Sequence, residues 1–164
     1  MNSTRDFSSG QEAANDHRVL VFGRLLGAAN RLEFLLGRDL EQEFGISHSL
    51  FELLLLAGRA GDAGIPVRDI AQARVLTSGG ATRLVQRASV LGLIERKNSV
   101  SDARVQLIRL SAHGEDLLLK ASSRHVENIE RYLLDLLSPT EAEVFSEAIK
   151  RISKNAAQEL PVMP

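Results

Sequence analysis

Cysteine and tryptophan are absent from this chain of 164 residues, and tyrosine occurs once, at Tyr132. Without cysteine the protein has no disulfide, no thiolate nucleophile, no cysteine-bound zinc and no thiol redox sensor. Aromatic residues make up only 4% of the sequence. This scarcity argues against single-strand nucleic-acid binders, because those proteins stack bases on aromatic side chains. Duplex DNA binding is not excluded, since it depends on arginine, polar side chains and helix ends.

Long apolar runs and enzyme motifs are missing as well. The longest apolar cluster, residues 53–57, is far shorter than the ~18 residues of a membrane span, and the first 15 residues lack the apolar core of a secretory signal. The sequence contains no HExxH, no GxSxG and no phosphate-binding glycine loop with its lysine. His113 and His125 are too far apart to share a metal ion. We therefore expect a cytoplasmic protein that is not an enzyme and needs no cofactor or metal.

Charge is distributed unevenly along the chain. Residues 67–111 contain eight Lys or Arg against three Asp or Glu, a net charge of +5, whereas the rest contains 12 basic and 18 acidic residues, a net charge of −6. A basic island in an acidic protein is typical of a phosphate-binding surface. The alternative is a solvated surface whose charges only keep the protein soluble.

Long helices are predicted on both sides of this island. Apolar residues spaced by three and four predict a helix over residues 16–44. Its apolar stripe is wider than one buried side needs, because Val21 and Phe34 extend it, so a second partner such as another subunit is expected. A helix over residues 112–137 should bury Leu117, Leu118, Ala121, Val126, Ile129, Leu133 and Leu136. After the start signal SPTE at residues 138–141, a last helix to residue 157 should bury Val144, Phe145, Ala148, Ile149 and Ile152.

A helix-turn-helix is predicted between the long helices. Residues 51–59 form a nearly all-apolar helix, with Ser47 or Ser49 as its cap and a possible capping box of Ser49 with Glu52. A short helix follows Pro66 over residues 67–73. The turn LTSG at residues 76–79 then leads into a helix that ends at Gly92, with Thr77 or Ser78 as its cap. Two helices joined by a short turn are the helix-turn-helix arrangement.

The second of these helices has two distinct faces. One face is apolar, and the other is polar and basic near its N-terminus, as DNA-recognition helices are. The polar face carries Gly79, Thr82, Arg83, Gln86 and Arg87. Residues 93–96 and the alternating residues 104–110 then predict a β-hairpin with a turn at 98–103. The predicted fold class is therefore mainly α, a winged helix-turn-helix with one small β-hairpin and long flanking helices.

Five pieces of this sequence match a family pattern in order and spacing. They are Ile70-Ala71, SGGATRLVQR at residues 78–87, GLIER at 92–96, DAR at 102–104 and LSAHG at 110–114. On these pieces the chain resembles the MarR family of winged-helix transcriptional regulators over residues 16–157. Three departures are Gln86 where Asp is usual, Ala88-Ser89 in place of Leu-Glu, and Pro66 in place of Ser or Thr.

The resemblance implies a homodimeric DNA-binding transcriptional regulator, expected to be a repressor. Residues 1–15 would be a disordered tail, residues 16–45 and 112–160 the helical dimerisation region, and residues 46–111 the DNA-binding region. Two recognition helices about one DNA turn apart, on the order of 34 Å, imply a pseudo-palindromic site.

Candidate DNA contacts follow from the chemistry of the residues at these positions. Thr82, Arg83 and Gln86 are assigned to the major groove, where they can contact thymine, guanine and adenine respectively. Backbone N–H groups of Ser78 and Gly79 at the helix N-terminus should hold a phosphate. The wing residue Arg104 is assigned to the minor groove. The candidates for phosphate contacts are Arg68, Arg74, Arg87, Arg96 and Lys97.

Many such regulators also bind a small aromatic or anionic effector between the DNA-binding region and the dimerisation helices. Candidates here are Arg24, Arg31 and His48. Two alternatives remain at this point. One is a constitutive DNA-binding protein without an effector. The other is a winged-helix module for protein contacts, which would favour an acidic recognition helix, although no acid occurs from Thr77 to Gly92.

Overall fold

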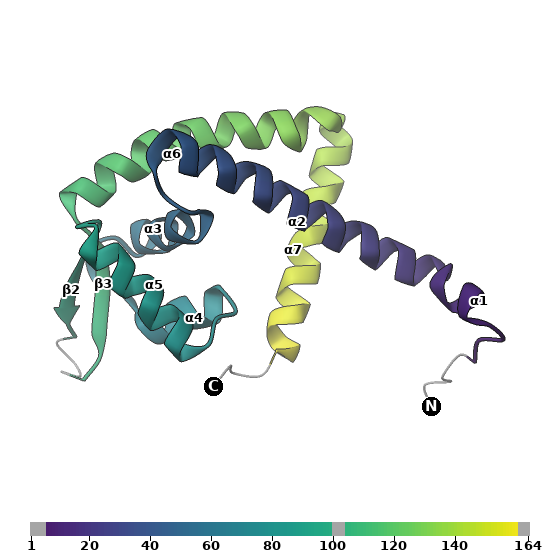
Figure 1. The fold of residues 1–164 in the computed structure, drawn as a ribbon, viewed down its shortest axis with the longest axis horizontal. Coiled ribbons are helices and arrows are strands. Elements are labelled where there is room, and N and C mark those ends of the chain that lie inside the picture. Colours follow the sequence, from purple (N-terminus) through teal and green to yellow (C-terminus); the bar gives the residue numbers. More distant parts are fainter. Residues whose placement is uncertain (1–5, 100–103, 161–164) are drawn as a thin grey trace.

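A computed structural model describes residues 6–99 and 104–160 of the chain, and Figure 1 shows the arrangement of its elements. In chain order they are α1 (Gly10–Ala14), α2 (His17–Phe44), α3 (His48–Ala60), η1 (Gly61–Ala63), β1 (Ile65–Pro66), α4 (Val67–Ala73), α5 (Ser78–Val90), β2 (Ile94–Asn98), β3 (Gln106–Leu110), α6 (Ala112–Tyr132), η2 (Leu134–Leu136) and α7 (Pro139–Glu159). Helices α4 and α5 with the small sheet form a winged helix-turn-helix between long helices. The predicted fold class is confirmed.

The core of the molecule is centred on α3, the helix predicted to be buried from its apolar composition. Leu50, Leu53 and Leu54 of this helix are fully buried. Helices α4, α5 and α6 and strand β3 pack around them and contribute Ile70, Val85, Ala121 and Ile108. Helix α5, the predicted recognition helix, is therefore held on the same core as the helices that flank it.

The start of α3 confirms Ser47, one of the two predicted caps, although the helix begins at His48 and not at Phe51. Ser47 is the cap, with an extended backbone (φ −73, ψ 156) and an Oγ that accepts a hydrogen bond from the Leu50 N–H at 3.4 Å. The capping box of Ser49 with Glu52 is wrong, because Ser49 lies inside the helix. The carboxylate of Glu52 instead accepts a hydrogen bond from Arg74 Nη1 at 2.8 Å.

The wing is a three-stranded antiparallel sheet in the order β1-β3-β2. Ile94 pairs with Leu110 and Asn98 with Gln106, as expected for the predicted hairpin, whereas residues 100–103 of its turn lie outside the described residues. Strand β1 was not predicted, since two residues are too short to show alternation. Pro66 lies in this edge strand, which is the place in a sheet where a residue without an N–H is tolerated.

Helix α6 begins tightly against the end of α5. Ser111 Oγ donates a hydrogen bond to the Gly92 carbonyl at 2.6 Å and accepts one from the Gly114 N–H at 2.9 Å. A Cβ added to Gly114 would overlap the carbonyl oxygen of Leu93. Glycine is therefore required here by close approach of two backbones, which explains the glycine of the LSAHG motif.

The last two long helices expose apolar residues that the sequence pattern predicted to be buried. No residue of α7 is buried in the single chain, and Val144 and Ile152 are 65% and 53% exposed. Val126 and Leu136 are also exposed. These predictions are wrong for the isolated chain. The buried residues of α6 are Gly114, Ala121, His125 and Asn128. His125 and Asn128 each come one position before an apolar residue that was predicted to be buried, Val126 and Ile129.

The N-terminal part of the described chain extends away from the winged helix. Residues 10–14, within the stretch expected to be a tail, form α1 with Ser9 as its cap. Asp16 then caps α2 and accepts a hydrogen bond from the Arg18 N–H at 3.0 Å. In Figure 1, α1 and the first half of α2 lie at the opposite end of the longest axis from the sheet.

Candidate nucleic-acid interface

The N-terminus of α5 is open to solvent. Thr77 is the cap, and its Oγ1 accepts a hydrogen bond from the Gly80 N–H at 3.1 Å. Ser78 and Gly79 are exposed, and a Cβ added to Gly79 would meet no atom within 4 Å. First-turn N–H groups of a helix have no carbonyl partner within it and favour an anion. The start of α5 is therefore accessible to an anion, and the phosphate contact of Ser78 and Gly79 stays a prediction.

The polar face of α5 is exposed along its length. Ala81, Val85 and Ala88 are buried, which turns the opposite side outward. Thr82 Oγ1 donates a hydrogen bond to the Ser78 carbonyl at 2.8 Å, and Arg83 Nε donates one to the Gly79 carbonyl at 3.4 Å. These local bonds hold both side chains near the first turn. The exposed residues on this face are Gly79, Thr82, Arg83, Gln86 and Arg87.

Arg96 joins the recognition helix to the wing. From β2, its Nη2 donates to Gln86 Oε1 at 2.8 Å, and its Nη1 lies 3.5 Å from Gln106 Oε1 on β3. The neutral amide of Gln86 thus accepts a hydrogen bond from Arg96 at the position where the family usually has Asp. Gln106 was missed by the sequence analysis. The strand register could have identified Gln106 as a neighbour of Arg96. Arg96 pairs with Ile108, and Gln106 lies two residues from Ile108 on the same face of β3.

Several predicted contacts meet in a hollow of about 380 Å³ between α5, the wing and the start of α4. Thr82, Arg68, Arg96 and Arg104 line it together with Gln106, and Val85 and Val105 are among its apolar residues. Three arginines around one hollow concentrate positive potential, which attracts phosphates. The structure therefore brings together Arg68, Thr82, Arg96 and Gln106, which lie on four elements and are up to 38 positions apart in the sequence.

Not all of the predicted phosphate contacts lie equally open. Arg87 and Lys97 are exposed, and Arg68 is exposed beside Asp69, with Nε 3.2 Å from the carboxylate. Arg74 differs, because its side chain is only 25% exposed and forms the ion pair with Glu52 of α3. This pair joins the end of α4 to the core and leaves Arg74 less available than the others.

Comparisons with known proteins agree with this geometry. No family model matches the sequence. The HTH-type transcriptional regulator MhqR of Bacillus subtilis (strain 168) is 31% identical over 114 residues, which cover 70% of this chain and 77% of that protein. A MarR family transcriptional regulator from Streptomyces coelicolor, solved in complex with DNA, is 22% identical and superposes with a TM-score of 0.79 over 94% of this chain and 92% of its own. The chain belongs to the MarR family of transcriptional regulators.

Other family members have the same fold. AbsC, also from S. coelicolor, is 24% identical with a TM-score of 0.75 over 92% of this chain and 97% of its own. The MepR–DNA complex of S. aureus is 23% identical with a TM-score of 0.70 over 85% and 98%. As a MarR family member, the protein is a transcriptional regulator and not an enzyme.

The candidate effector residues of this MarR protein do not all lie in one environment. Arg24 and Arg31 are exposed on α2. His48, at the start of α3, is partly buried, with Nδ1 3.7 Å from Glu33 and Nε2 3.7 Å from Glu52.

A second histidine lies beside His48. The ring of His125 on α6 is 5.8 Å from that of His48 and 4.6 Å from that of Phe51, measured between centroids. Burial lowers the pKa of His125 below its ordinary value of 6.5, and the neighbouring His48 lowers this pKa further, while Glu52 opposes the shift. This MarR protein therefore has a neutral imidazole packed between α3 and α6 near neutral pH.

Across residues 6–99 and 104–160, no group of three or more His, Asp or Glu side chains is placed to hold a metal ion. None of the helices in those ranges is long and apolar enough to cross a membrane.

Proposed function

We propose that this MarR family regulator acts as a homodimer, binds a pseudo-palindromic duplex DNA site and represses transcription until a small effector releases it. The observation that carries the proposal is the exposed face of α5, where Thr82, Arg83 and Gln86 lie beside a hollow lined by three arginines. The solved DNA complexes of the S. coelicolor and S. aureus relatives support duplex DNA as the ligand.

Each part of this surface has a distinct role in the proposal. Arg83 contacts guanine through two donors, and Thr82 contacts a thymine methyl group. Gln86 contacts adenine, with its amide plane held by Arg96, which makes Arg96 a positioning residue. The N–H groups at the start of α5 bind a phosphate. Arg104 enters the minor groove beside the wing.

The dimer is supported by apolar surface that the single chain leaves uncovered. Large apolar side chains are exposed on α2 and α7, including Phe22, Phe34, Val144 and Ile152. Large apolar side chains exposed together on a helix are a feature of subunit interfaces, so this surface favours a dimer. A two-fold dimer built on these helices would place two recognition helices about 34 Å apart, one turn of DNA.

The DNA proposal is tested by replacing Arg83 with alanine. A binding site is first selected from random duplexes, and affinity is then measured on that site and on a scrambled duplex. Arg83→Ala should cost roughly 1–3 kcal/mol on the selected site and relax the preference at one base position. Arg131→Ala, at an exposed arginine on α6, is the matched control and should bind normally. An equal loss on both duplexes would make Arg83 a phosphate contact instead.

Salt dependence tests the wider class of function. Phosphate contacts release counterions, so affinity should fall steeply between ~50 and 200 mM salt. If the protein binds no selected duplex at any salt concentration, a winged-helix module for protein contacts replaces the proposed DNA-binding function. Repression is tested with a reporter placed behind the selected site, whose expression should rise when the regulator is removed.

Release by an effector is supported by the region around His48. Within the described chain, three buried side-chain atoms have no hydrogen-bond partner: His48 Nδ1, Arg74 Nε and His125 Nδ1. Buried polar atoms of this kind are uncommon, and each calls for an explanation. Because Glu52 pairs with Arg74 at 2.8 Å and lies 3.7 Å from His48, a small anionic molecule at this site would replace Glu52 on Arg74 and thereby act on the C-terminal end of α4. Arg24 and Arg31 remain further candidates on α2.

Benzoate is a suitable first probe for this site, because it is both aromatic and anionic. It should raise the melting temperature of the protein and weaken its binding to the selected duplex. His48→Ala should reduce both effects, whereas His113→Ala, at an exposed histidine of α6, should not. If benzoate and related carboxylates change neither quantity, the constitutive DNA-binding alternative is favoured.

A further inference from the structure

The turn between α4 and α5 contains a strained residue. Among the residues that the structure describes, Val75 is the one non-glycine residue with a positive φ, at 52°. The left-handed region is unfavourable for any residue with a Cβ, and most of all for a β-branched one. Where a helix ends in this conformation, the usual residue is glycine. The chain therefore maintains an unfavourable backbone conformation three residues before α5 begins at Ser78.

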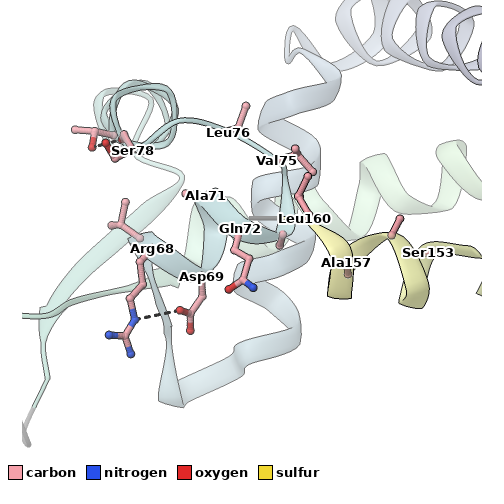
Figure 2. A pocket seen from close by; sticks show the side chains of 14 residues that line it. Arg68, Asp69, Ala71, Gln72, Val75, Leu76, Ser78, Ser153, Ala157 and Leu160 are labelled. Atoms are coloured by element: carbon pink, nitrogen blue, oxygen red, sulfur yellow. Dashed lines mark hydrogen bonds and ion pairs between the residues drawn. The ribbon is translucent and has the colours of Figure 1, made fainter. Parts of the chain in front are cut away.

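The side chain of Val75 does little to hold this conformation. It is 53% exposed. Together with Leu76 and Leu160 it lines an open groove of about 960 Å³ between the turn and the C-terminal end of α7 (Figure 2). The groove gives the turn room to change conformation. Strained backbone persists only where the surrounding structure holds it, so other residues must fix the turn.

Backbone hydrogen bonds close the turn on both sides of Val75. The Arg74 N–H donates to the Ile70 carbonyl at 3.0 Å, and the Leu76 N–H donates to the Ala71 carbonyl at 2.9 Å. Both carbonyls belong to α4, so these bonds tie the turn to α4 alone. A contact outside α4 is needed to fix the end of this helix in the molecule.

The side chain of Arg74 supplies that contact. Its Nη1 lies 2.8 Å from Glu52 Oε2 on α3, and the two side chains are only 25% and 27% exposed. Glu52 is flanked in α3 by Phe51 and Leu53, which are buried in the core. A partly buried ion pair is screened less than a surface pair, and removal of one partner leaves the other charge poorly solvated. The carboxylate therefore anchors the residue next to Val75 to the core.

We propose that Glu52 is a positioning residue for DNA recognition, because its ion pair with Arg74 holds the strained turn and thereby sets the direction of α5. Without the carboxylate, Val75 relaxes to a negative φ, which β-branched residues prefer, and the chain enters α5 at a different angle. Glu52 does not itself contact DNA, since phosphates repel a carboxylate. Arg74 then acts through the turn and not as a phosphate contact. This inference rests on the proposed DNA-binding function.

Glu52→Ala tests the proposal on the selected and the scrambled duplex. Its affinity for the selected duplex should fall about tenfold relative to the scrambled one, comparable to the cost of one mismatched base pair, because base contacts depend on the exact position of α5. Glu52→Gln keeps an acceptor for Arg74 and should lose less. The matched control is Glu43→Ala, which breaks another Glu–Arg pair of 2.8 Å, the one with Arg124 between α2 and α6. It should leave the affinity ratio unchanged.

Val75→Gly separates positioning from a general loss of stability. Glycine adopts a φ of 52° without strain, so this variant should melt about 2–4 °C above the wild type. Added to Glu52→Ala, it should restore the ratio of the two affinities, because the turn then keeps its conformation without the ion pair. Circular dichroism shows whether each variant is folded. If Glu52→Ala does not fold, Glu52→Gln takes its place in the same comparison.

The two affinities distinguish the possible outcomes. A selective loss that Val75→Gly reverses supports the positioning role. Tighter binding of Glu52→Ala to both duplexes would overturn it, because Arg74 released from Glu52 would then be a phosphate contact. An unchanged ratio, or a selective loss that glycine does not reverse, would also overturn it. If the wild type binds no selected duplex, the proposed DNA-binding function fails, a result that is distinct from any of these.

Discussion

The apolar surface on α2 makes a quantitative prediction for Phe22. This side chain is 64% exposed in the single chain, and neighbouring residues on the same helix, such as Leu26, are exposed as well. Phe22→Ser removes the aromatic ring while disturbing little within the chain, because the ring makes few contacts there. Its effect on folding should therefore be small and its effect on dimerisation large.

The size of the effect follows from the exposed area. An aromatic residue has about 150–250 Å² to bury, so covering the exposed part of Phe22 removes roughly 130 Å² per copy. At ~25 cal/mol per Å² this amounts to about 3 kcal/mol. Two-fold symmetry doubles the loss to about 6 kcal/mol per dimer. Since each 1.4 kcal/mol is tenfold, the dissociation constant of the dimer should rise about 10⁴-fold.

Sedimentation equilibrium over a wide concentration range measures this constant for the wild type and the variant. Val90→Ser, at an exposed valine on the last turn of α5, is the matched control and should leave the dimer unchanged. If Phe22→Ser and Val90→Ser dimerise equally well, the face of α2 that carries Phe22 is not the subunit interface. Circular dichroism would show that both variants remain folded.

Three further predictions concern stability and specificity. Gly114→Ala should destabilise the protein by roughly 1–3 kcal/mol in urea unfolding, because its Cβ overlaps the Leu93 carbonyl, whereas Gly79→Ala should not destabilise it; equal stabilities would contradict the close approach. Arg96→Met should weaken binding to the selected duplex by about 1 kcal/mol more than binding to a scrambled one, and a uniform loss would indicate a phosphate contact. The lowered pKa of His125 means that the unfolded state gains a proton first as the pH falls below about 6.5, so the wild type should lose stability there. His125→Phe should flatten that dependence in thermal unfolding, and a parallel pH profile would rule out His125 as its source.

Much of the fold was predictable because its signals are local. The predicted start of α7 is confirmed, because Ser138 caps the helix and forms a full capping box with Glu141, and Pro139 is the first helical residue. The short helix after Pro66 spans the predicted residues 67–73. The outward face of α5 also followed from the spacing of its alanines and valines. Caps, glycines and periodicity act over a few residues, so they can be recognised without tertiary contacts.

The remaining features depend on residues that meet only in the folded chain. The partners of Arg74 and Arg96 are 22 and 10 positions away in the sequence, and no local pattern identifies them. Helix α6 shows a second limit. Apolar periodicity does not distinguish a face that packs within the chain from one that packs on another molecule. Val126 was therefore expected inside, whereas His125 is the residue that contacts Phe51.

The hydrogen bonds that join Gly92, Ser111 and Gly114 fix the start of α6 to the end of α5. A tilt of α6 therefore moves the winged helix with it. The helix has 21 residues and is therefore about 30 Å long. A tilt of roughly 10° about its far end would move the junction, and the recognition helix attached to it, by about 5 Å. Base pairs are spaced about 3.4 Å apart along the duplex. In the proposed DNA-binding dimer, a small change of angle among the long helices would thus displace each recognition helix by more than one base pair and end its match to the proposed DNA site.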